Sequence, residues 1–462
     1  MSTQLLNERP TMTETKKKPA PKETSPYWEK FARFENDPKQ LAWVLPVRRA
    51  GISRFAELGF PTLEDEDWRF TNVAPIAKLP FKPVLDYSGD GVAVESLGQL
   101  AFAALKGPRL VFVNGHFAPE LSSVPPRQDG ITVSSLAAAL VTESALVEKH
   151  LARHARTDDN AFAALNTAFF QDGAFVHVPA GKSLAEPVQL VFLSTGQEAG
   201  ATSHPRNLIL AEQNSAVTVV EHYASAVAAP QLTNVVTEIV AGENAVVEHC
   251  KFSDESPQAF HVATLQLHCA RASRVTAHSI VTGARLSRHN IRTTLAGEGV
   301  ECILNGLYLT KGDQLADHHM IVEHAAPHCA SHEYFNGILQ DRSKGVFHGR
   351  ILVRPGAQKT DAKQTNKNLL LSDEATADTK PQLEIYADDV KCTHGATIGQ
   401  LNDESIFYLR SRGIGLDNAR RMLIHAFAGE IIERIRCEPV RDELDKLVWD
   451  RLEQNEQVAV SK

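Results

Sequence analysis

The pattern of apolar and polar positions changes twice along the chain, and its middle part is the most regular. Between residues 174 and 397, short apolar runs alternate with Gly, Asn, Ser and Asp, and no helix of ordinary length interrupts them. Such runs predict strands joined by turns, and a long succession of them is typical of a β-sandwich, a barrel or a β-helix. The predicted strands lie at residues 188–193, 208–210, 217–220, 235–240, 246–247, 265–267, 275–281 and 303–309.

A short repeat favours the β-helix. Val-Glu-His begins at Val220, Val247 and Val322, so the first two copies are 27 residues apart and the second and third are 75 residues apart. The longer spacing is close to three of the shorter, as expected if each coil of a solenoid takes roughly 25 residues.

The flanking parts have helical patterns. Residues 27–58 and 136–170 are rich in Ala, Leu, Glu and Lys with helical spacing, and between them Leu110–Val113 is a predicted strand that ends at an Asn114-Gly115 turn. We therefore predict a disordered tail at residues 1–25, a mostly helical N-terminal domain at 26–173, a β core at 174–402, for which the repeat favours a β-helix, and a C-terminal helical domain at 403–462.

Three helices are predicted in the C-terminal domain. One opens at Asp403, and a second runs to about residue 435. The last, at 440–456, alternates acidic and basic residues and is predicted to be a solvated surface helix. The second has a predicted apolar face made of Ala419, Met422, Leu423, Ala426, Phe427 and Ile431.

Composition excludes several function classes. The net charge of −8 argues against a nucleic-acid partner, and no apolar run is long enough to span a bilayer, so no membrane partner is expected. The N-terminus carries Lys16-Lys17-Lys18 but no apolar secretory segment, which predicts a cytoplasmic protein in a reducing compartment. Free thiols are therefore expected at Cys250, Cys269, Cys302, Cys329, Cys392 and Cys437.

A thiol and an imidazole share one face of a predicted strand at residues 388–397. Alternation places Val390, Cys392 and His394 on one side of the strand, and the last two are roughly 7 Å apart along the backbone. They can converge on one soft or borderline metal ion. From spacing alone, the alternative is a buried Cys and His in a core strand.

A second histidine-rich stretch is a weaker metal candidate. His324, His328 and His332 share a face in a strand, with Cys329 among them and His318 and His319 upstream. Pro327 interrupts any helix that would align them, so we expect mainly hydrogen-bonded polar residues on successive coils.

Nucleotide-binding motifs are missing from the sequence. Gly181-Lys182-Ser183 has Val176 where a phosphate-binding loop needs its first glycine, and Gly297 and Gly299 are followed by Cys302 instead of a third glycine. Asp388 and Asp389 are adjacent, so in a strand they point to opposite faces and cannot act as an acid/base pair. No catalytic residue is predicted.

Four segments together are similar to one family. Residues 389–399, the Phe407-Tyr408-Leu409-Arg410-Ser411-Arg412-Gly413-Ile414 stretch, residues 366–372 and Trp68-Arg69-Phe70-Thr71 closely resemble the SufB/SufD family of iron–sulfur cluster assembly scaffolds. Gly395, where SufB proteins have an acidic residue after the shared histidine, favours the SufD branch. So do Cys392 at a SufD-type position and the lack of a Cys-rich N-terminal motif.

The resemblance implies a fold and partners. The fold is a right-handed parallel β-helix that pairs, core to core, with a SufB-type scaffold, while a SufC-type ATPase docks on the C-terminal domain and a cysteine desulfurase system delivers sulfur on the partner's side. Iron, or a transient iron–sulfur cluster, would be shared with the partner at His394 and Cys392. A flavin, known in some complexes of the family, has no motif here. The residues expected to contact the ATPase are Phe407, Tyr408, Leu409, Arg410, Arg412, Gly413, Arg420 and Arg421.

Two alternatives remain at this stage. The chain could form a homodimeric SufB/SufD-like scaffold without a distinct partner. It could also be a β-helix carbohydrate-active enzyme, which would require clustered carboxylates on one face of the solenoid.

Overall fold

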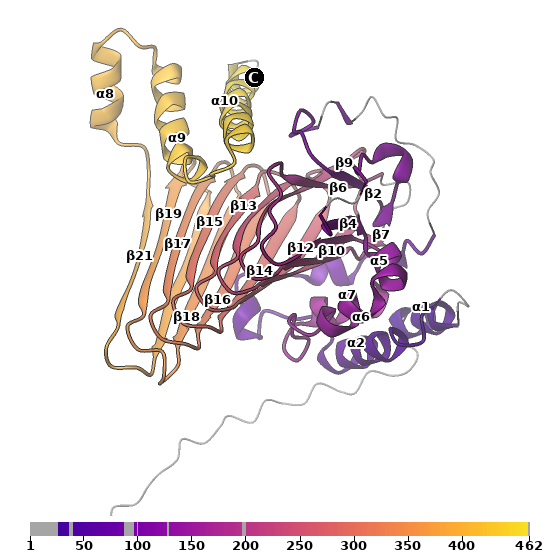
Figure 1. The fold of residues 1–462 in the computed structure, drawn as a ribbon. Coiled ribbons are helices and arrows are strands. Elements are labelled where there is room, and N and C mark those ends of the chain that lie inside the picture. The colour runs from indigo at the N-terminus through magenta and orange to yellow at the C-terminus, as the bar shows by residue number, and fades with distance from the viewer. Residues whose placement is uncertain are drawn as a thin grey trace, which may run out of the picture.

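The computed structural model describes residues 26–36, 40–86, 97–98, 100–126, 129–195 and 200–460 (Figure 1), with side chains up to residue 453. The predicted tail at 1–25 lies outside the described residues. The helices are α1 (Pro26–Glu35), α2 (Leu45–Leu58), η1 (Glu66–Trp68), α3 (Ala74–Ala77), η2 (Pro119–Leu121), α5 (Leu136–Thr142), α6 (Ser144–His150), α7 (Ala161–Phe169), α8 (Asp403–Ser411), α9 (Leu416–Ile432) and α10 (Glu438–Val460).

The strands are β1 (Lys82–Pro83), β2 (Arg109–Val113), β3 (His116–Phe117), β4 (Thr132–Ser135), β5 (Ala174–Val178), β6 (Val188–Ser194), β7 (Ala201–Ser203), β8 (Arg206–Ala211), β9 (Ala216–Ser225), β10 (Leu232–Ala241), β11 (Val246–Asp254), β12 (Phe260–Cys269), β13 (Arg274–Val281), β14 (Leu286–Leu295), β15 (Glu301–Thr310), β16 (Leu315–His324), β17 (Ala330–Leu339), β18 (Lys344–Val353), β19 (Asp361–Leu370), β20 (Thr376–Ile385) and β21 (Lys391–Gly399).

The strands form two sheets that face each other. Sheet A runs in the order β20-β18-β16-β14-β12-β10-β8-β5-β4, and sheet B in the order β21-β19-β17-β15-β13-β11-β9-β6-β2-β3. From β8 onward the chain alternates between the sheets and the pairing is parallel, with register partners 26 residues apart for Phe260 and Leu286 and 32 apart for Lys344 and Thr376. The β-helix prediction is confirmed as a parallel solenoid of about eight turns.

One corner of the solenoid repeats from coil to coil. In each connection from a sheet A strand to the next sheet B strand between β8 and β19, one residue has a left-handed backbone, at Asn214, Asn244, Ala272, Gly299, His328 and Lys359. Each backbone N–H at these positions donates to a carbonyl of the next coil, for example Asn214 N to Glu243 O at 2.8 Å and Ala272 N to Glu298 O at 2.8 Å. The hydrogen bonds between successive coils therefore continue around this corner, from sheet A into sheet B.

The Val-Glu-His tripeptide is not the structural repeat. Val247 pairs with Val217, so the copies that begin at Val220 and Val247 are out of register by three residues. The third copy lies in β16, which belongs to the other sheet. The 27-residue spacing matched the length of a coil, but the three copies occupy different structural positions.

The predicted hairpin near the N-terminus is confirmed. β2 is followed by Asn114 and Gly115, both with positive φ, and β3 returns antiparallel to it. β2 also pairs with β6 in parallel, so it extends sheet B into the N-terminal part of the chain.

The N-terminal helices cover the outer face of sheet A (Figure 1). All nine residues of α7 are buried between α2 and this sheet. Gly51 of α2 allows the close approach of the two helices, because a Cβ there would lie 2.8 Å from the carbonyl oxygen of Ala164.

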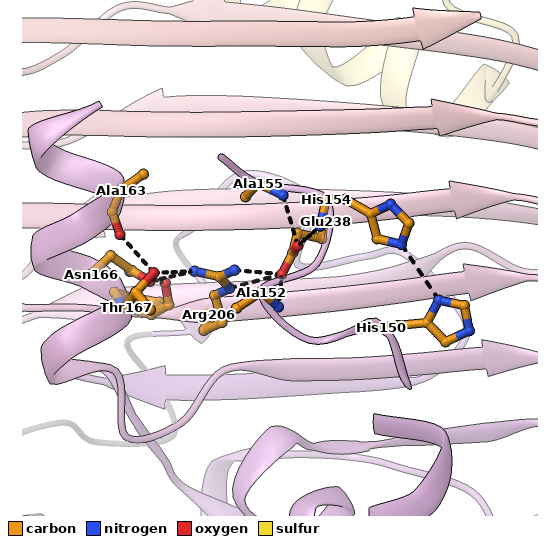
Figure 2. A network of polar contacts seen from close by, with 10 residues as sticks. His150, Ala152, His154, Ala155, Ala163, Asn166, Thr167, Arg206 and Glu238 are labelled. Carbon is orange, nitrogen blue, oxygen red and sulfur yellow. Dashed lines mark hydrogen bonds and ion pairs between the residues drawn. The ribbon is translucent and has the colours of Figure 1, made fainter. Parts of the chain in front are cut away.

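A buried ion pair ties this layer to the sheet (Figure 2). Arg206 Nη2 of β8 donates to Glu238 Oε2 of β10 at 2.5 Å, and neither side chain is exposed. Burial alone would raise the pKa of Glu238, but Arg206 and backbone N–H groups outweigh it and hold the pKa below its usual value. The backbone donors to the carboxylate are Ala152, His154 and Ala155, while Arg206 also donates to Asn166 and Thr167 of α7.

The C-terminal helices stand at the outer face of sheet B (Figure 1). The predicted start at Asp403 is confirmed, with the Asn402 side chain accepting from Ser405 N at 2.9 Å. The predicted apolar face of α9 is partly wrong, because Met422 is exposed while Ile424 and Ala428 are buried. Among the described helices, none combines the length and apolar character required to span a membrane.

The prediction that the last helix is a solvated surface helix is also wrong. One stripe of α10 packs into a cluster shared with sheet B and α9, because the apolar residues recur at every fourth position between the charges. These buried residues are Val440, Leu444, Val448 and Leu452.

Candidate metal site at the open end of the solenoid

The last coil of the solenoid ends in two edge strands. Within the described part of the chain, β20 is paired only with β18 in its sheet and β21 only with β19. Pro381 lies in the middle of β20, a position that suits an edge strand because proline has no N–H to donate. Apolar side chains stay exposed at this end, with Ile385 38% and Ile398 48% accessible. No coil in the described part of the chain covers them.

Cys392 and His394 lie on this edge strand, as the alternation predicts. Their register partners in β19 are Ala362 and Gln364, which are both buried and face the interior of the solenoid. The Cys392 and His394 side chains therefore share the interior-facing side of the open coil. His394 is exposed, so the alternative of a buried core histidine is wrong for the isolated chain.

Cys392 differs from His394 in its environment. It is half-buried and packs beside the cluster that includes Ala362. Burial, with a smaller contribution from Asp361, raises the pKa of its thiol. The thiol is therefore protonated near neutral pH, and a metal ion would have to displace the proton to bind sulfur.

The side chains of the second histidine-rich stretch do not meet at one site. His324 lies inside the solenoid and its Nε2 is 2.8 Å from Ser331 Oγ, as expected for a hydrogen-bonded polar residue. His328 occupies a left-handed corner, and the His332 ring lies 3.7 Å from Asp361. Cys329 is buried, with its sulfur 3.2 Å from the carbonyl oxygen of Gly297.

In the structure His319 lies beside His348 and Asp67 instead. Its neighbour in register is His348, one coil further on, and Asp67 approaches from the N-terminal part of the chain. The 29-residue spacing of the two histidines equals one coil and was a usable signal. Asp67 could not be found this way, because its proximity arises only when the N-terminal segment folds onto sheet A.

The predicted docking residues gather on α8 and its exit. No residue of α8 is buried, and Phe407 and Tyr408 are 74% and 56% exposed. Arg412 lies over the Tyr408 ring, 4.6 Å from its centroid, and Gly413 takes a left-handed conformation that ends the helix. Leu409 is half-buried and Arg410 is exposed.

The two arginines of α9 differ from each other. Arg420 is exposed and lines a groove with Ile406 of α8 and Asp417. Arg421 instead pairs with Glu453 at 3.3 Å and lies over the Trp449 ring, so it holds α9 against α10.

Comparison with known protein families agrees with this architecture. Residues 192–427 match the SufBD core domain of the SUF system for iron–sulfur cluster assembly, and residues 24–190 match the SufBD protein N-terminal region. The chain belongs to the SufBD family. The SufBD core match covers the solenoid from the end of β6 to β21 and continues into α9, so it includes the open end, Cys392, His394 and all of α8.

Relatives in this family cover nearly the whole chain. An iron–sulfur cluster assembly SufBD family protein of Synechocystis sp. is 35% identical over 87% of this chain and 89% of its own length. The iron–sulfur cluster assembly protein SufD of Escherichia coli is 33% identical over 88% of this chain and 93% of its own. SufD of Bacillus subtilis is 25% identical over 91% and 96%, respectively.

Proposed function

We propose that the chain is a SufD-like, non-catalytic subunit of a SufBCD-type scaffold complex that assembles iron–sulfur clusters in the cytoplasm. Membership of the SufBD family supports a role in iron–sulfur cluster assembly. The similarity to SufD proteins along nearly the full length supports a SufD-like subunit. The structural observation that carries the proposal is the open last coil, which presents Cys392 and His394 on an edge strand.

We propose that a SufB-type scaffold docks on this open coil. Unpaired edge strands expose rows of N–H and C=O groups that another chain can complete by adding a strand. The exposed apolar residues Ile385 and Ile398 would be buried in such a contact. Continuation of both sheets from one solenoid into the next would join the two cores.

Iron, as the cargo of assembly, would bind where the two scaffolds meet. A neutral imidazole at His394 is a good ligand for ferrous iron, and a thiolate at Cys392 is a softer one. Two ligands from one chain leave the site incomplete, so the partner must supply the others. Such a divided site releases its cluster more easily than four ligands in one chain.

The remaining activities are assigned to partners. We propose that a SufC-type ATPase contacts α8 through Phe407 and Tyr408, and that a cysteine desulfurase system supplies sulfur on the SufB side. A flavin in the complex is compatible with this scheme, but no residue of this chain is assigned to it.

The test of the iron site is His394→Ala in the complex co-expressed with SufB- and SufC-type partners. Because His394 is exposed, we expect the free energy of unfolding of the chain to change by less than about 0.5 kcal/mol. Iron and sulfide per assembled complex should fall to less than half, since one ligand is lost. Cys392→Ser is the companion variant, with a smaller expected loss because the thiol is half-buried.

The control is His332→Ala, which removes a histidine of β17 outside the open coil. It should leave the iron and sulfide content unchanged. Normal iron and sulfide in the His394 variant would refute the ligand role. Size-exclusion chromatography of the chain without partners tests the homodimeric alternative, because a stable dimer would show that the chain pairs with a second copy.

A further inference from the structure

A second group of metal-ligating side chains lies on the outer face of sheet A, whereas Cys392 and His394 belong to sheet B. His319 of β16 and His348 of β18 are register neighbours, and their rings meet edge to face with centroids 4.4 Å apart. Asp67, in the short helix η1, places Oδ1 3.2 Å from His319 Nε2. The three ligand atoms, one from each residue, all lie within 4.8 Å of one another.

These distances suit a shared metal ion. A first-row divalent ion binds nitrogen and oxygen at about 2.0–2.2 Å, so two of its ligand atoms are about 3.0–3.4 Å apart in octahedral or tetrahedral geometry. The 3.2 Å separation of Asp67 and His319 falls in this range. Two imidazoles and one carboxylate form a donor set typical of Fe²⁺ and Zn²⁺ sites that keep open positions.

The surrounding residues hold the ligands in place. His348 Nε2 is 2.8 Å from Gln382 Oε1, which leaves Nδ1 for an ion and fixes the ring as an outer hydrogen bond does in metal sites. Trp68, next to Asp67, is buried under Arg288, whose guanidinium lies 3.8 Å from the ring centroid. The buried aromatic ring anchors η1 to the sheet.

The charged residues around the three ligands also favour binding of a cation, because each nearby basic residue is already paired with a carboxylate other than Asp67. Glu66 is paired with Lys380 at 2.6 Å, and Asp317 with Arg288 at 2.5 Å. Asp67 instead faces the two imidazoles, so its negative charge is left for the ion.

We propose that Asp67, His319 and His348 bind one divalent transition-metal ion of borderline softness, such as Fe²⁺, Co²⁺ or Zn²⁺. The two histidines are buried, whereas the Asp67 side chain is 43% exposed, so solvent reaches the ion from one side and completes its coordination. The ion would fasten η1 to two successive coils of sheet A. This site is separate from His394 and does not depend on the proposed function.

The test is metal titration of the full-length chain after treatment with a chelator, under anaerobic conditions. Co²⁺ reports ligand geometry through its visible absorption, and Zn²⁺ competition gives the affinity. The variants are Asp67→Asn and His348→Gln, with His394→Ala and His332→Gln as controls. We expect the unaltered chain and both controls to bind one equivalent at this site, with nitrogen and oxygen ligation.

In Asp67→Asn and His348→Gln the affinity should fall by more than the roughly 10–100-fold that loss of an outer-shell partner costs. Zn²⁺ should also raise the melting temperature of the unaltered chain in a concentration-dependent way, and this rise should disappear in Asp67→Asn. Asp67 is partly exposed, so that variant is expected to fold even if His348→Gln does not. An absence of saturable binding in the unaltered chain, or equal affinity in Asp67→Asn, would overturn the proposal.

Discussion

At the residue scale, buried polar side chains determine how the layers are held together. Glu238 and Arg206 are both inaccessible, and their contacts reach a loop and a helix of the N-terminal layer (Figure 2). A buried charge is stable only when it is paired and hydrogen-bonded, so these contacts work as one unit. In a surface pair such as Glu243 with Arg271, neither charge depends on its partner in this way, because water solvates each of them alone.

We therefore expect Glu238→Ala to lower the free energy of unfolding by about 3–5 kcal/mol, because Arg206 is left buried without its carboxylate. The matched control Glu243→Ala breaks a partly exposed pair at the end of the same strand and should cost less than about 1 kcal/mol. Urea unfolding of the two variants measures the difference. Similar losses of unfolding free energy in the two variants would contradict the conclusion that the buried pair of Arg206 and Glu238 holds the layers together.

At the element scale, the three C-terminal helices have two roles. α9 and α10 share a hydrophobic cluster with the outer face of sheet B, through residues such as Ile424 and Val448. Deletion of the whole segment would expose that cluster and confuse loss of docking with loss of folding. α8 buries no residue, so substitutions on this helix can separate the two effects.

For the double variant Phe407→Ser/Tyr408→Ser we expect loss of co-purification with a SufC-type ATPase, with a Kd at least tenfold weaker, because exposed aromatic residues carry much of the energy of interfaces. The melting temperature should stay unchanged, since both side chains are exposed. Val141→Ser, on the N-terminal α5 and 66% exposed, is the control and should keep the ATPase. Retention of the ATPase by the double variant would refute the docking assignment.

At the scale of the whole molecule, many histidines are enclosed as neutral groups. Burial is the largest cause that lowers the pKa in each case, to about 3 for His204 and His318 and about 4 for His222, His319 and His324. In the unfolded chain the same groups have a pKa near 6.5. The unfolded state therefore binds more protons than the native state between pH 6.5 and about 4.

Stability should thus be fully present above pH 6.5 and should decline as the pH falls toward 4. Each such histidine contributes a slope of about 1.4 kcal/mol per pH unit within this window. Urea midpoints at pH 7.5, 6.0 and 5.0 measure the decline, and calorimetry at pH 5.5 should show proton uptake on unfolding. Constant midpoints between pH 7.5 and 5.0 would contradict the prediction.

The sequence by itself determined the local features of this protein. Turn residues and apolar runs predicted the succession of short strands, Asn114-Gly115 predicted the hairpin, and alternation placed Cys392 and His394 on one face, because these features depend only on neighbours along the chain. The choice of a β-helix among the possible β folds came from the family resemblance. The resemblance of several segments identified the family. Helix faces were predicted less well, since the direction in which α9 and α10 are buried depends on the sheet they contact.

The tertiary structure alone decided which distant residues meet. Register between coils made neighbours of His319 and His348 and separated the Val-Glu-His copies, because a shift of a few residues changes every partner without changing the local pattern. It also left the last coil open, so that His394 is exposed at an edge instead of enclosed. Asp67 joins the two histidines across about 250 residues of chain only because the N-terminal segment folds back onto sheet A, where burial of Trp68 drives its docking.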